Sequence, residues 1–167
     1  MRTGSSRCSQ SQAAGFSLVE LMTVIAVIAI LALIAVPTFL DKIVKEQVVE
    51  ALPLAKIVSG PVDSAWRASG ALPANNAALG LPEPSKIVSN LVSSVQLEDG
   101  VIHIRFGNQA NGYLKGKTLS LRPALVEDTP LVPIAWVCGY ATEPQNMKVL
   151  GTNRTDVEKQ YLPLRCL

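Results

Sequence analysis

The sequence predicts an α+β fold in which one long N-terminal helix packs on an antiparallel β-sheet of three or four strands. Three observations lead to this prediction. An uncharged apolar run extends over residues 21–40, an apolar stripe at helical spacing continues it, and short alternating segments separated by turn residues fill the second half of the chain. The 167 residues suit one compact domain with a modest core.

The apolar run has the length that an α-helix needs to cross a hydrocarbon layer about 30 Å thick. Arg2 and Arg7 precede it. A basic flank of this kind predicts a cytoplasmic N-terminus and an exported C-terminal part. Pro37 lies inside the run and has no backbone N–H, so we expect the helix to bend there or to lose the regular hydrogen bonding of one turn.

The helix is expected to continue as an amphipathic segment over residues 41–69, with its apolar stripe facing a sheet. Ser59-Gly60-Pro61 predicts a kink or a short interruption, and Ser69-Gly70 predicts the end of the helix. The residues of the stripe are Val44, Val48, Leu52, Ala55, Val58, Val62 and Trp66.

The second half of the chain contains the predicted strands. A loop rich in proline and glycine covers residues 70–84, and residues 85–92 suit a helical turn or an edge strand. Asp99-Gly100 predicts a tight hairpin, because both positions tolerate a positive φ. The expected strands lie around Val95 and Leu97, over 101–106, around Leu119 and Leu121, and over 132–138, the last with Trp136 as its large core residue.

A short motif precedes the apolar run: Gly15-Phe16-Ser17-Leu18-Val19-Glu20. Glu20 places one carboxylate at the start of an apolar surface, where a charge requires a partner or a function. The motif and the run resemble the class III signal of type IV pilins and related pseudopilins, as in a type IVa-like prepilin. The resemblance implies cleavage by a dedicated peptidase after Gly15, N-methylation of Phe16 and an assembly role for Glu20.

The same resemblance implies the organisation of the chain. Residues 1–15 would be a cleaved leader, 16–40 a hydrophobic transmembrane and assembly helix, 41–69 its amphipathic continuation, and 70–167 the globular head. Cys8 would leave with the leader. Cys138 and Cys166 would remain and would bound the family's disulfide-closed C-terminal region, whose closure stabilises by roughly 3–4 kcal/mol on the chain-entropy argument.

The function that the resemblance implies is that of a structural subunit in a type IV pilus filament, a homopolymer supporting adhesion, twitching motility or DNA uptake. Its partners would be the prepilin peptidase and N-methyltransferase and the assembly machinery. The subunit would lie in the bacterial inner membrane before assembly and in the extracellular filament afterwards. Glu20 would pair with the new amine of Phe16 on a neighbouring subunit; the alternative is a Glu20 that reaches the membrane interface and is satisfied within its own chain.

Nothing in the sequence indicates an enzyme, a cofactor or a metal site. The single histidine and the two remaining cysteines have no ligand spacing, and no catalytic triad or phosphate-binding loop is present. His103 is interpreted as a solvated surface residue. Arg2 and Arg7 account for the net charge of +2, which argues against a general polyanion binder.

Two short surface patterns have a functional and an ordinary interpretation. Lys115 and Lys117, with Arg122 nearby, are either a DNA-binding patch or a solvated loop, and the loop is favoured. Asn153-Arg154-Thr155 fits an N-glycosylation sequon, a pattern that often arises by chance.

Four alternatives to the main interpretation stay open. The N-terminal region could be a secretory signal peptide or a plain signal anchor, although residues with the small-x-small cleavage pattern do not follow the apolar run. An anchored enzyme would need a reactive constellation in residues 70–167. A pseudopilin of a type II secretion system more often lacks the cysteine pair. A minor pilin is not distinguished from a main shaft subunit.

Overall fold

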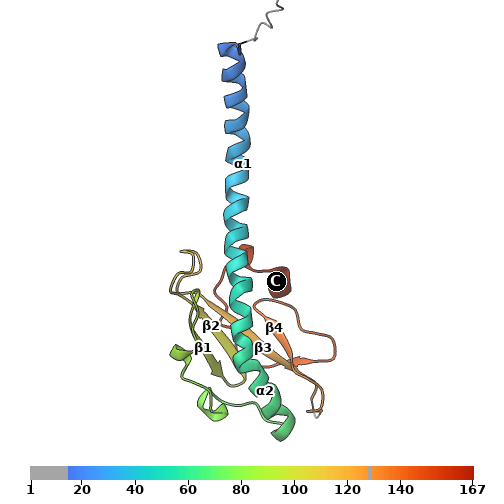
Figure 1. Cartoon of the computed structure of the whole chain (residues 1–167). Helices are drawn as coiled ribbons and strands as arrows, with labels where there is room; N and C mark the ends of the chain where they lie inside the picture. The colour runs from blue at the N-terminus through green and yellow to red at the C-terminus, as the bar shows by residue number, and fades with distance from the viewer. Residues whose placement is uncertain (1–14, 128) are drawn as a thin grey trace, which may run out of the picture. The chain divides into compact units, whose positions relative to one another are not determined.

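The computed structural model describes residues 15–167 except residue 128, and it leaves out the side chains of residues 34–38. The chain divides into two units between Thr38 and Phe39, and each is described by itself. The main elements, labelled in part in Figure 1, are α1 Leu18–Ala51, the 3₁₀ turn η1 Leu52–Ala55, α2 Lys56–Ser69, β1 Val92–Glu98, β2 Val101–Phe106, β3 Thr118–Leu125, β4 Ala135–Cys138 and β5 Lys148–Val149. Short 3₁₀ turns follow at Ala77–Leu79, Pro84–Lys86, Lys159–Tyr161 and Leu164–Cys166.

The first unit contributes the N-terminal part of α1. Residues 15–33 are all exposed. No helix within the described residues combines the length and the apolar character that crossing a membrane requires. The spanning helix expected over 16–40 therefore stays a prediction. Pro37 lies within α1 but among the side chains outside the described residues, so its expected bend also stays a prediction.

The second unit begins with the helical layer, and the predicted stripe faces the core. Val44, Val48, Val58 and Val62 are fully buried, and Ala55 nearly so, while Leu52 and Trp66 are partly buried and pack against the same core. Gly70 ends α2 in the left-handed conformation with φ +67°, as predicted from the glycine.

Of the kink or short interruption predicted at Ser59-Gly60-Pro61, the interruption is wrong. Helix α2 runs through Pro61, and the break lies earlier, in the 3₁₀ turn η1 that contains Pro53. Val58 and Val62 flank Gly60-Pro61 and are both fully buried against the sheet. Their packing holds the helix across the proline, because tertiary burial outweighs the loss of one helical hydrogen bond.

The sheet is antiparallel, with strand order β1-β2-β3-β4, and β5 pairs with the end of β3. Glu98 pairs with Val101, so only Asp99 and Gly100 form the turn of the first hairpin. Their φ values are +47° and +81°. This confirms the hairpin predicted from Asp-Gly, since a two-residue loop of this kind requires positive φ at both positions.

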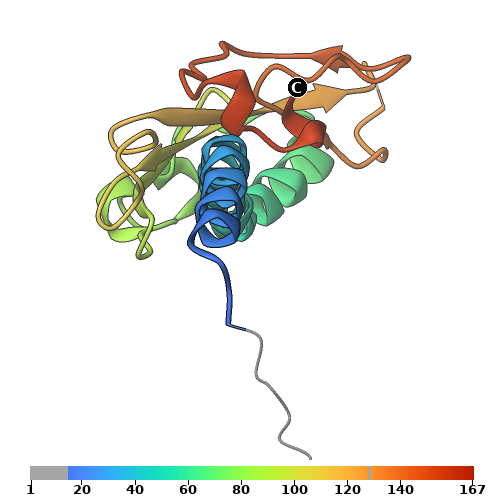
Figure 2. The ribbon, with the colours of Figure 1, turned by 90° about the horizontal axis from the view of Figure 1, so that it is seen from above.

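The two faces of the sheet are both covered. On the inner face, Ile102, Ile104, Phe106 and Leu119 are fully buried in one core with the helical stripe, and Figure 2 shows α2 on one side of the sheet. The outer face carries His103, and the expectation that it is a solvated surface residue is wrong: it is 7% exposed. The strand alternation placed His103 on the face away from the helix, but the C-terminal segment covers that face (see below).

The last predicted strand is shorter than expected. Strand β4 begins at Ala135 rather than at residue 132, because Pro133 has no N–H to donate and Val132 N–H donates instead to Thr129 O in a turn. Trp136 is partly buried against the core rather than at its centre. With the helix on an antiparallel sheet and a disulfide near the C-terminus, the α+β fold predicted from the sequence is confirmed.

Candidate assembly site in the N-terminal helix

The first turn of α1 is organised by Ser17. Its Oγ accepts a hydrogen bond from the Glu20 N–H at 3.4 Å, and its carbonyl accepts one from the Leu21 N–H at 3.1 Å. Ser17 therefore caps a helix whose first residue is Leu18. Serine with glutamate three residues later is the spacing of a capping box, a signal in the sequence that our sequence interpretation did not use.

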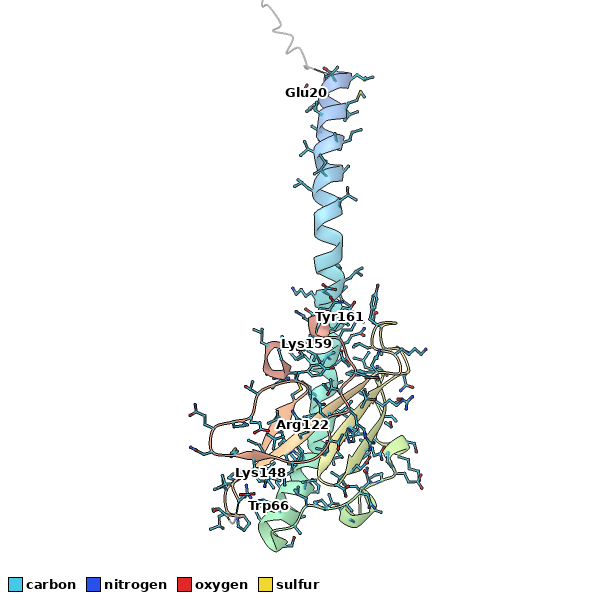
Figure 3. The ribbon with its side chains drawn as sticks, turned by 180° about the vertical axis from the view of Figure 1, so that it is seen from behind. Glu20, Trp66, Arg122, Lys148, Lys159 and Tyr161 are labelled. Carbon is cyan, nitrogen blue, oxygen red and sulfur yellow. A yellow bond between two sulfur atoms is a disulfide. The ribbon has the colours of Figure 1, made fainter. Side chains whose placement is uncertain are left out.

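Glu20 is fixed at its backbone and open at its side chain. Its carbonyl accepts a hydrogen bond from Thr23 Oγ1 at 2.8 Å. In the part of the chain that the structure describes, no hydrogen bond or ion pair reaches its carboxylate. The positive end of the helix dipole favours a negative charge in this first turn. The labelled Glu20 in Figure 3 lies at this end of α1.

The rest of this helical segment presents an almost entirely apolar surface. Large apolar side chains are exposed on all sides of the helix, among them Leu18 at 75% and Leu33 at 77%, and Phe16 just before the helix is 77% exposed. Ala26, Ala29 and Ala32 recur at every third position and permit close approach of another helix. A continuous apolar surface of this kind marks a contact with other proteins or with lipid.

Gly15 and Phe16, the two residues expected to be processed, precede the helix. Both are exposed, and no atom outside the neighbouring residues lies within 4 Å of the position that a Cβ would take on Gly15. The expected leader lies outside the described residues apart from Gly15, and so does Cys8. The structure thus brings Gly15, Phe16 and Glu20 into one short exposed segment.

The expected disulfide is present. Cys138 at the end of β4 and Cys166 in the last 3₁₀ turn are joined by a bond of 2.02 Å and are 28 residues apart in the sequence. Both residues are buried, and Tyr140 N–H donates to Cys166 O at 2.9 Å. The bond therefore ties the chain's last residues to the edge of the sheet.

Residues within the loop that the disulfide closes form hydrogen bonds with β3. Thr118 N–H donates to Asp156 Oδ1 at 2.5 Å, and Ser120 N–H donates to Thr155 Oγ1 at 3.1 Å. Asn153 uses both ends of its amide: Nδ2 donates to Gly139 O at 2.8 Å, and Oδ1 accepts from the Thr155 N–H at 3.0 Å. These bonds give the residues of the apparent sequon a structural role.

The basic residues singled out in the sequence differ in their surroundings. Lys115 is exposed and Lys117 half-buried in the connection between β2 and β3. Arg122, labelled in Figure 3, lies on β3 and directs Nη2 to Gly139 O at 3.5 Å. This arrangement fits the interpretation as a solvated loop. Within the described residues, no group of three or more histidine, cysteine or acidic side chains could hold a metal ion.

Sequence reasoning also missed Asn76, which joins the loop before the sheet to β1. The residue is 3% exposed, its Nδ2 donates to Pro82 O and Val95 O, and its Oδ1 accepts from the Leu97 N–H at 2.7 Å. An asparagine in a loop is ordinary in composition, so only the tertiary contacts identify it.

Comparison with known proteins agrees with this architecture. A profile of the pilin family of bacterial filament proteins matches residues 44–167, and a profile of the prokaryotic N-terminal methylation motif matches residues 10–36. The chain is 30% identical over 161 residues to a fimbrial protein of Neisseria meningitidis serogroup B, covering 91% of this chain and 92% of that protein.

Two further relatives give the same result. A type IV major pilin protein PilE of Neisseria gonorrhoeae is 33% identical over 158 residues, covering 91% of this chain and 92% of the relative. The fimbrial protein EcpC of Eikenella corrodens is 33% identical over 156 residues, with coverage of 91% and 89%. By its long helix, its disulfide-closed sheet and these matches, the chain belongs to the pilin family, whose members are structural filament subunits rather than enzymes.

Proposed function

We propose that this chain is cleaved after Gly15, methylated at Phe16 and polymerised through α1 into a type IV pilus. Membership of the pilin family makes it a subunit of an extracellular filament built from pilin subunits. The observation that carries the finer proposal is the exposed apolar segment 15–33, which includes one carboxylate without a partner among the described residues.

The proposed pairing follows from charge. Cleavage after Gly15 creates a cationic amine on Phe16, and the Glu20 carboxylate is the acid four residues away. Once neighbouring helices pack side by side and exclude water, an isolated carboxylate is strongly unfavourable, so it pairs with the amine of an adjacent subunit. A head-to-tail contact that does not close on itself then extends into a helical filament.

The proposal includes a stage in the inner membrane. Residues 21–40 contain no charged side chain, and Arg2 and Arg7 precede them. A segment of this composition is stable in hydrocarbon, with the basic flank on the cytoplasmic side. The partners at this stage are a prepilin peptidase that also methylates and the machinery that extracts subunits into the filament.

The experiment replaces Glu20 by alanine and by glutamine, with Glu46→Gln as the matched control on an exposed position of the same helix. We expect both Glu20 variants to be cleaved and to lower the yield of sheared filaments by about tenfold or more, because the buried amine loses its counter-charge. Glu46→Gln should assemble normally. Mass spectrometry of the subunit reads the N-terminus at Phe16 and its methylation. Wild-type filament yield from both Glu20 variants would remove the assembly role.

We further infer that the chain is a main shaft subunit. Four relatives from Neisseria gonorrhoeae that are 30–33% identical carry the name type IV major pilin. Quantification of the chain in sheared filaments tests this inference: a main subunit dominates the preparation, and a minor pilin forms a trace of it. The filament would support adhesion, twitching motility or DNA uptake. Separate whole-cell assays of these three activities in a strain without the gene would show which of them depends on the chain.

A further inference from the structure

The outer face of the sheet holds a buried polar cluster that filament assembly does not use. His103 on β2 and Ser120 on β3 are paired across the two strands, and they are 7% and 0% exposed. His103 Nδ1 lies 2.9 Å from Ser120 Oγ. A buried imidazole that contacts a hydroxyl requires a defined protonation state, because each hydrogen of the pair must have an acceptor.

The cover of this cluster is the segment 150–157, which we call the C-terminal cover. Gly151 lies directly over Val101: a Cβ on Gly151 would come within 2.1 Å of Val101 Cγ2, and the glycine has φ +83°. Leu150 N–H donates to Pro123 O at 2.9 Å, and Arg154 N–H donates to Ser120 Oγ at 2.9 Å. The cover is therefore fitted closely onto the outer face of β2 and β3.

The serine hydroxyl connects the histidine to the cover. Ser120 Oγ already accepts a hydrogen bond from the Arg154 N–H, and it has a single hydrogen of its own to donate. Neutral His103 can accept that hydrogen at Nδ1. Protonated His103 carries a hydrogen on Nδ1, so the hydroxyl would have to accept a second bond and direct its own hydrogen elsewhere. Protonation thus leaves the Ser120 hydrogen without its Nδ1 acceptor and places a charge in the buried cluster that holds Arg154 to the sheet.

Burial of the imidazole acts in the same direction. Burial lowers the pKa of His103 below its ordinary value of 6.5, the Arg154 cation lowers it further, and the Glu98 anion opposes them. Arg154 and Glu98 form a two-bond ion pair, with Nη1 to Oε2 at 2.6 Å and Nη2 to Oε1 at 2.5 Å, so each offsets the other's effect on the imidazole. The remaining charged groups on the elements packed around His103 are Arg105 on β2, Arg122 on β3 and Asp156 in the cover, which bonds the Thr118 N–H.

We propose that the C-terminal cover is a pH-sensitive latch, which His103 holds closed while neutral and loosens when it takes up a proton. An opened cover exposes the imidazole, whose pKa then returns toward 6.5. The open state therefore binds more protons than the closed state below that pH. The opening equilibrium rises as the pH falls, by at most about tenfold per pH unit between 6.5 and the lowered value. Opening also frees the backbone of Thr118 and Ser120 at the edge of β3.

The test is hydrogen exchange by mass spectrometry on the full chain in detergent micelles, at pH 7 and pH 5, with each rate divided by the intrinsic rate at that pH. We expect peptides of 150–157 and of 118–120 to lose protection at pH 5 relative to pH 7, by at most about tenfold per pH unit below 6.5, while β1 keeps its protection. In His103→Asn, which keeps a polar group without a titration in this range, the selective loss should vanish. An equal loss in the variant, or equal losses across the sheet, would overturn the proposal.

A second measurement is independent of whether the variant folds. The chain contains one histidine, so a proton NMR titration of the imidazole needs no assignment. The latch requires a midpoint below 6.5 in the folded wild type, and a midpoint at or above 6.5 refutes it. Arg154→Gln removes the neighbouring cation and should raise the midpoint. Glu20→Ala leaves the cluster intact and should change neither readout, so failure of the latch and failure of the assembly role are distinguished.

Discussion

At the scale of single residues, Asn76 illustrates how one side chain fixes a long loop. It satisfies the carbonyls of Pro82 and Val95 and the N–H of Leu97 while almost fully buried. Replacement by alanine leaves these backbone groups without their partner, in a place that water reaches poorly. A buried polar group that loses its hydrogen bond destabilises a fold far more than an exposed one does.

We therefore predict that Asn76→Ala lowers the free energy of unfolding by about 2–3 kcal/mol. Asn75→Ala is the matched control, because Asn75 is exposed and its Oδ1 only accepts from the Ala78 N–H in a local turn. The control should lose about 0.5–1 kcal/mol. Thermal and urea unfolding of the full chain in detergent measure both values, and equal losses in the two variants would contradict the role assigned to Asn76.

The same scale shows where sequence reasoning stops. Gly15, Phe16 and Glu20 could be identified because their motif is local and contiguous. His103 could be assigned to the outer face of the sheet from the alternation of β2, but its burial depends on a segment about fifty residues later. Arg154 and Asn153 lie in a region without periodicity, and their partners Glu98 and Gly139 follow from tertiary packing alone.

At the scale of elements, the helical layer carries two prolines with different surroundings. Pro53 lies in η1, which follows α1 directly and where the α-helical ladder has already changed to a 3₁₀ turn, and Pro61 lies inside α2, where it removes a hydrogen bond to the preceding turn. The sequence predicted the break at Gly60-Pro61 because that dipeptide has the lowest helix propensity. The burial of Val58 and Val62 on either side of this dipeptide keeps the helix continuous. Strand order and the first hairpin were more predictable, since turn chemistry and alternation act locally.

This difference between the prolines gives a prediction. Pro61→Ala restores an N–H within α2 and should raise the free energy of unfolding by about 1–3 kcal/mol. Pro53→Ala should raise it by less, because the chain around Pro53 is already a 3₁₀ turn and an N–H restored there regains an α-helical bond only if that turn rewinds. Chemical unfolding followed by circular dichroism compares the two. A larger gain from Pro53→Ala than from Pro61→Ala would show that α2 is not strained at Pro61.

At the scale of the whole molecule, the segment proposed to polymerise and the segment that forms the stable core are different parts of the chain. The exposed segment 15–33 has no part in the buried core, which is formed by residues of the second unit. The disulfide Cys138–Cys166 and the bonds of the C-terminal cover lie entirely in that second unit. This separation explains why the motif and the fold class could each be predicted from its own part of the sequence.

Two kinds of variant should therefore act on separate readouts. Replacing Cys138 and Cys166 by serine opens a loop of 28 residues, which should lower the free energy of unfolding by roughly 3–4 kcal/mol and the melting temperature by on the order of 10 °C. Cleavage after Gly15 should continue in this variant, because the peptidase acts on the N-terminal segment.

Glu20→Gln should behave in the opposite way. It should abolish most filament yield and leave the melting temperature of the head unchanged, because its carboxylate has no contact with the core in the part of the chain that the structure describes. Calorimetry of the full chain in detergent and sheared-filament yield from cells give the two readouts. If the serine variants blocked cleavage, or if Glu20→Gln lowered the melting temperature of the head by several degrees, the two functions would be coupled through the chain. If the two variants affect only their own readout, the Glu20 carboxylate acts only between subunits, where it pairs with the Phe16 amine of the next chain.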